Sequence, residues 1–158
     1  MSMICHLAAA SDRVIAELHS HPDAISEFVG TTQRVISIDK AWSLIHFLLT
    51  GEAWSGEMPL AFVIAGGTPV GDIDVGYGPA RTIDSETVSQ IDTALRAISR
   101  ATLANNWNSD AIRDAELYAV NPDDKHSELE YAGAHFDSMK AFVHALAEEK
   151  LGMIVYLC

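Results

Sequence analysis

The sequence predicts an α+β fold: a single domain, residues 1–158, in which a small sheet is surrounded by about five to seven helices. Apolar runs at the two ends of the chain, Met3 to Ala10 and Gly152 to Cys158, have the composition of strands. Between them, apolar residues recur at helical spacing in segments that begin at capping residues and end at Gly, Asn or Pro. A chain of 158 residues that is 49% hydrophobic can build one full core.

The terminal runs are apolar at consecutive positions, which is typical of strands covered on both faces. We therefore expect both in the sheet, and side-by-side pairing would tie the two ends of the chain into one core.

The helices are expected where their start and stop signals occur. Ser11 is placed to cap a helix over residues 12–20, and Pro22 is placed to open a short second helix that ends at Gly30. The other helices are expected over residues 38–50, 59–65, 85–104, 109–117 and 127–150. Residues 59–65 fit a buried strand equally well. Gly133 is expected to break the last helix.

The helix expected over residues 38–50 is apolar around most of its circumference but carries one polar line. At 100° per residue, Asp39, Ser43, His46 and Thr50 fall within an arc of about 60°, with Trp42 at its edge. The line is either the solvent face of a packed helix or the lining of a cleft. In a cleft, Asp39 and His46 could hold a substrate or exchange protons, although about 10 Å of helix separates them.

Residues 66–81 hold five of the ten glycines and are expected to form a loop of tight turns or, less typically, an anion-binding loop. Asp72 and Asp74 alone are too few ligands for a metal site, and no metal or cofactor is expected. The loop is predicted to pack beside the 38–50 helix, with Arg81 or Tyr77 near its polar line. The candidate binding residues are Asp39, Trp42, His46, Thr50, Asp74, Tyr77 and Arg81.

The net charge is −12, and residues 1–80 and 81–158 each contribute −6. Such a field repels nucleic acid and anionic membranes, and it favours either a basic protein partner or simple solubility. No apolar stretch reaches the length that spans a bilayer, and the N-terminus lacks the basic start of a signal peptide. Cys5 and Cys158 are expected to be free thiols, which indicates a cytoplasmic protein.

Four segments carry a family resemblance: the opening SMICHL, the stretch IDKAWSLIHFLLTG, the motif DVGYGPAR and the terminal GMIVYL. Together they span nearly the whole chain, which resembles the YfbM-like family of small bacterial proteins, a domain of unknown function. The resemblance implies an α+β fold with helices around a small sheet, and it brings no established activity.

Two functions fit these observations. The first is an acidic protein-binding module, for example a toxin-neutralising protein of the immunity type. The alternative is a small-molecule-binding protein or enzyme whose cleft is lined by the Asp39/His46 line and the 66–81 loop. The sequence leaves open whether the chain is an enzyme.

Overall fold

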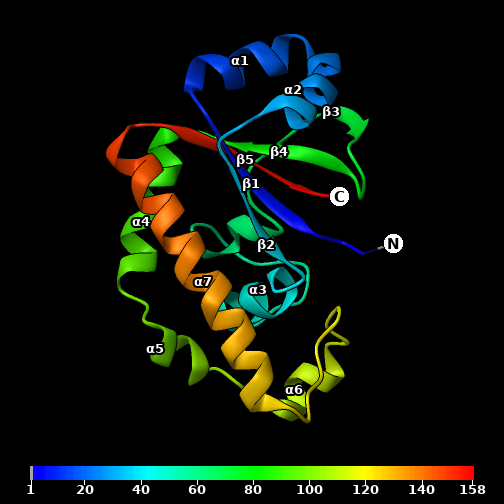
Figure 1. Cartoon of the computed structure of the whole chain (residues 1–158), viewed down its shortest axis with the longest axis vertical. Coiled ribbons are helices and arrows are strands. Elements are labelled where there is room, and N and C mark those ends of the chain that lie inside the picture. Colours follow the sequence, from blue (N-terminus) through cyan, green and yellow to red (C-terminus); the bar gives the residue numbers. More distant parts are fainter. Residues whose placement is uncertain (1) are drawn as a thin grey trace.

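A five-stranded antiparallel sheet forms the centre of the computed structural model, which describes residues 2–158 (Figure 1). The strand order is β2-β1-β5-β4-β3. The strands are β1 (Cys5–Ala10), β2 (Val35–Asp39), β3 (Thr68–Asp74), β4 (Pro79–Ile83) and β5 (Gly152–Leu157).

Both terminal strands lie inside the sheet, as predicted. They also pair with each other, from Cys5 opposite Leu157 to Ala10 opposite Gly152. Alternate side chains of a strand point to opposite faces, so each of these strands serves two cores. Leu7 packs in the larger core and Ala8 in the smaller one. This double coverage explains why both runs are apolar without alternation.

Helices cover both faces of the sheet (Figure 1). Helices α1 and α2 close the smaller core, and α3, α4 and α7 close the larger one. The helical elements are α1 (Asp12–Ser20), the 3₁₀ turn η1 (Pro22–Ala24), α2 (Ile25–Thr31), α3 (Trp42–Thr50), the 3₁₀ turn η2 (Leu60–Val63), α4 (Ser85–Arg96), α5 (Arg100–Ala104), α6 (Ser109–Asp114) and α7 (Lys125–Glu148).

The capping residues behave as the sequence predicts at several helix ends. The Ser11 hydroxyl accepts the backbone N–H of Val14 at the start of α1, and Asp84 accepts that of Thr87 at the start of α4. Gly51 ends α3 with φ +80, a conformation that glycine adopts readily.

Other boundaries were predicted wrongly. Residues 35–39 form strand β2, so the third helix begins at Trp42 and not at residue 38. Residues 66–81 are mostly the β3–β4 hairpin rather than a loop, and residues 59–65 contain only the turn η2. The helix expected over residues 85–104 is split into α4 and α5, whereas α7 passes Gly133 without a break.

Within residues 2–158, no helix is both long and apolar enough to cross a membrane.

Candidate functional site

Two polar residues of α3, Ser43 and His46, lie inside the molecule, whereas Thr50 at its C-terminal end is half-buried and lines a separate pocket. Ser43 and His46 are buried, and so is Trp42 beside them. The Ser43 hydroxyl accepts the backbone N–H of Tyr118, 3.1 Å away, in the segment between α6 and α7. The indole of Trp42 donates to the backbone oxygen of Met3 (2.9 Å) and stacks on the Tyr118 ring.

His46 holds the segment that follows α3. Its Nε2 lies 2.8 Å from the backbone oxygen of Ser55, and because a carbonyl only accepts, this nitrogen carries the proton. Burial is the main cause that lowers the pKa of His46, so the ring is neutral at pH 7. Its Nδ1 is buried without a hydrogen-bond partner in the described residues. Thr50 continues this pattern, because its hydroxyl accepts the N–H of Glu52 (3.1 Å). The polar line therefore anchors irregular segments to the helix.

Asp39 does not belong to that line. It ends strand β2 with φ +47, opposite Cys5 of β1, and its carboxylate accepts the hydroxyl of Tyr131 of α7 at 2.7 Å. Burial and this hydrogen bond raise the pKa of Tyr131 to about 12. The sequence-based spacing of 100° per residue put Asp39 on the same face as Ser43 only if the backbone before Trp42 were helical. Sheet pairing decides the conformation there, and the expectation of a shared Asp39/His46 face is wrong.

The glycine-rich segment forms a hairpin whose tip is closed by Asp74. One oxygen of its carboxylate accepts the N–H groups of Gly76 (2.7 Å) and Gly78 (2.9 Å), and these two bonds lower the pKa of Asp74. Asp74 is thus a turn-forming residue. The backbone N–H of Tyr77 donates to Leu157 of β5, while the Tyr77 ring is 38% exposed.

Arg81 of β4 binds backbone carbonyls and not the polar line of α3. Its Nη1 donates to the carbonyls of Phe62 (3.2 Å) and Gly66, and its Nη2 donates to that of Val63 (2.6 Å). These acceptors lie in and just after η2, so the guanidinium closes the C-terminal end of that turn. Arg81 or Tyr77 was predicted to lie near Asp39 or His46, and no hydrogen bond or ion pair joins these side chains within residues 2–158. The Arg81 charge does contribute to lowering the pKa of His46.

Arg81 also reaches a pocket of about 320 Å³ beside the hairpin. Trp54 and Tyr77 line the same pocket, and both are among the few large apolar or aromatic side chains that are exposed. Its remaining lining residues are Ile64, Pro69, Pro79, Val155, Tyr156 and Leu157. Of the predicted candidates, the structure thus brings Tyr77 and Arg81 together, and it adds Trp54, which is not among them.

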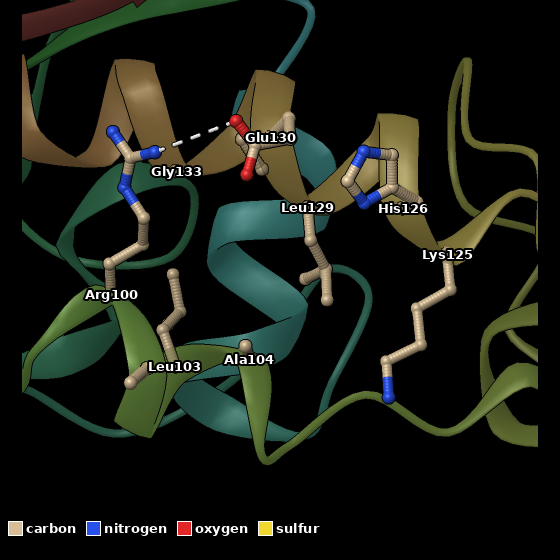
Figure 2. Close-up of a pocket in the computed structure, with 10 residues that line it drawn as sticks. Arg100, Leu103, Ala104, Lys125, His126, Leu129, Glu130 and Gly133 are labelled. Atoms are coloured by element: carbon tan, nitrogen blue, oxygen red, sulfur yellow. Dashed lines mark ion pairs between the residues drawn. The ribbon is translucent and has the colours of Figure 1, made fainter.

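A larger groove of about 600 Å³ lies between α5 and α7, and none of the predicted candidate residues lines it (Figure 2). Leu103, Ala104 and Leu129 line it, and Arg100 and Lys125 stand at opposite ends. The side chain of Arg100 crosses α7 at Gly133, where an added Cβ would lie 2.8 Å from the Arg100 Cδ. A glycine inside a helical pattern also indicates a close approach, and that reading of Gly133 would have pointed to the groove.

Of the Arg and Lys side chains that line this groove, Arg100 is paired, whereas Lys125 makes no ion pair within residues 2–158. Arg100 forms an ion pair with Asp137 (2.6 Å) and a longer one with Glu130 (4.0 Å), the latter drawn in Figure 2. Within residues 2–158, no group of three or more His, Cys, Asp or Glu side chains has the arrangement of a metal site. Cys5 and Cys158 are both free, the first buried and the second exposed.

The five-stranded antiparallel sheet and the helices that cover it define a small α+β domain. A family model for the domain of unknown function DUF1877 matches residues 1–156, and the chain belongs to this family. The crystal structure of YfbM, a protein of unknown function from Escherichia coli, superposes with a TM-score of 0.79 at 17% identity. That match covers 99% of this chain and 100% of YfbM, so the chain has a YfbM-like fold. No curated protein matches the sequence.

Proposed function

We propose that this domain is an acidic protein-binding module whose partner presents a basic surface around an apolar anchor side chain. A toxin-neutralising role of the immunity type is one example. The observation that carries the proposal is the position of the α5–α7 groove beside the most acidic part of the chain. Residues 109–130 hold seven acidic and two basic side chains, a net charge of −5, and they include the first turns of α7 that line the groove.

The acidic side chains are available to a partner. Of the 22 acidic residues, all but Asp39, Asp92 and Glu128 are exposed. A surface of one sign attracts an oppositely charged protein over about a Debye length, which is ~10 Å at 0.1 M salt. Charge complementarity mainly accelerates association and selects the partner.

The groove provides an apolar pocket for an anchor side chain of the partner, which surface charge alone does not provide. Binding energy at protein interfaces concentrates in a few apolar or aromatic anchors that enter well-packed pockets. Leu103, Ala132 and Leu129 give this groove an apolar lining. The Arg100 charge is met by Asp137 and Glu130, so it does not repel a basic partner strongly.

A defined test is selection from a displayed library of random 12-residue peptides on the immobilised whole chain. The expected winners combine several Lys or Arg residues with one aromatic or aliphatic anchor. Their association should slow markedly as ionic strength rises past ~0.1 M. Winners without basic residues, or binding that is insensitive to salt, would contradict the proposal.

Matched variants locate the interface with a selected peptide. Asp114→Lys changes an exposed acid of the 109–130 segment, and Asp72→Lys makes the same charge change on β3. The first should weaken binding several-fold more than the second. Ala101→Arg places a long side chain over the groove and should abolish binding, whereas Ala97→Arg, at the end of α4, should not. Equal effects of both charge changes would show attraction without a defined surface.

A second candidate function is small-molecule binding at the pocket lined by Trp54, Tyr77 and Arg81. It replaces the cleft expected from the sequence, since neither Asp39 nor His46 lines that pocket. We also propose a cytoplasmic location, which the two free thiols support.

A further inference from the structure

We propose that the Arg81 pocket binds a small organic carboxylate with a flat apolar body, held by the free edge of the Arg81 guanidinium and by the rings of Trp54 and Tyr77. This inference deepens the second candidate function. It is independent of the protein-binding proposal, because the pocket shares no lining residue with the α5–α7 groove.

The charge of Arg81 has no counter-charge in the part of the protein that the structure describes. Arg81 is largely covered, and burial lowers its pKa, yet no carboxylate of residues 2–158 lies within ion-pair distance of it. Nearby titratable groups supply no counter-charge. Burial raises the pKa of Cys5 to about 12, which keeps the thiol protonated, and His46 is neutral. Covered arginines are normally paired, so an unpaired one at a pocket is where an anion would be accepted.

Arg81 also has hydrogen-bond donors that the described residues leave unused. A guanidinium has five N–H groups in one plane. Three are used by the carbonyls of Phe62, Val63 and Gly66, and all three bonds come from Nη1 and Nη2. Nε–H and one Nη2–H have no acceptor within residues 2–158. Donors on adjacent nitrogens of this fork match the two oxygens of a carboxylate.

The shape and lining of the pocket suit a flat apolar group. At about 320 Å³ it lies at the small end of ligand sites. Trp54 is 58% exposed, and its ring packs against the buried ring of Trp42, with the two ring centroids 5.5 Å apart. The backbone N–H of Tyr77 donates to the backbone oxygen of Leu157, which fixes the position of Tyr77. Gly76 allows the hairpin tip to lie close to the residue after β5, because a Cβ at Gly76 would lie 2.6 Å from the Cα of Cys158. Aromatic walls and two prolines favour an aryl or similarly flat carboxylate over bare phosphate.

The test uses the whole chain and phenylacetate, with phenylacetamide as its neutral isostere and inorganic phosphate as the anion without an apolar body. Titration calorimetry or chemical-shift mapping should show phenylacetate binding at least tenfold more tightly than either comparator. Equal binding of the acid and the amide, tighter binding of phosphate, or no binding at millimolar concentration would overturn the proposal.

Variants must separate binding from folding, because Arg81 also closes η2. Trp54→Ala and Tyr77→Ala remove exposed rings and should leave the fold intact while weakening phenylacetate at least fivefold. Tyr131→Ala is the matched control, since its ring is exposed to nearly the same extent (37%) on α7, away from the lining residues. Unchanged affinity in both pocket variants, or an equal loss in the control, would remove the site. The groove variant Ala101→Arg should leave phenylacetate binding unchanged.

Discussion

Replacing Arg81 with methionine tests how much the carbonyl contacts of this residue stabilise the fold. Methionine keeps much of the aliphatic volume but removes all three hydrogen bonds to Phe62, Val63 and Gly66. Bonds from a charged donor contribute about 1.5–3 kcal/mol each, and their loss leaves three carbonyls short of a donor. The variant also escapes the penalty of covering an unpaired charge, which offsets part of the loss. We expect a net loss of about 2–4 kcal/mol in the free energy of unfolding.

Urea denaturation at pH 7 measures this difference, and a thermal melt should show a fall in Tm of roughly 4–16 °C. Arg13→Met is the control, because Arg13 makes only a solvent-exposed pair with Glu17 and its loss should be within experimental error. A loss below about 1 kcal/mol in Arg81→Met would refute the reasoning. It would show that water entering the pocket replaces the guanidinium at the carbonyls.

Three further expectations concern other parts of the molecule. In Gly30→Ala the new Cβ on α2 meets open space, so the free energy of unfolding measured in urea should rise by about 0.5–1 kcal/mol. Gly152→Ala should instead lower it strongly, because its Cβ would lie 2.5 Å from a backbone oxygen of β4. His46→Gln should flatten the pH dependence of stability: the folded pKa is lowered, so the His46 contribution is present above the unfolded pKa of about 6.5 and is lost as pH falls below it. A disulfide reagent should titrate one thiol, Cys158, in the native protein and also Cys5 after unfolding; two fast thiols in the native state would contradict the burial of Cys5.

The fold could be predicted from sequence where local signals and packing agree. Ser11 and Gly51 mark helix ends because capping depends on a few neighbouring backbone groups, and the terminal strands are apolar because both of their faces are covered. Strand β2 was missed because residues 35–39 look like the approach to a helix. They form a strand because they pair with β1, a contact between residues far apart in the sequence that local patterns do not reveal.

The candidate site was predicted less well, for a different physical reason. A polar line on an apolar helix indicates that its polar groups need hydrogen-bond partners. It does not indicate whether the partner is a ligand or the protein backbone. Here Ser43 and His46 serve the backbone of Tyr118 and Ser55, in irregular segments whose polar groups must also be paired. Arg81 and Tyr77 were found because a charge and a ring beside several glycines are unusual. Trp54 was missed because no local pattern connects it to them.

The two proposed sites differ in how salt should affect them, because the whole protein carries a net charge of −12. A basic peptide is attracted by that field, and screening it should lower the peptide affinity about tenfold or more between 0.02 and 0.15 M NaCl. Phenylacetate is repelled by the same field. It is held by a short-range contact to a covered guanidinium, and salt screens that contact much less than it screens the attraction between exposed charges. The two effects oppose each other, so its affinity should change by less than about twofold over the same range. Parallel tenfold losses for both probes would show that phenylacetate binds an exposed cation such as Lys125, and not the Arg81 pocket.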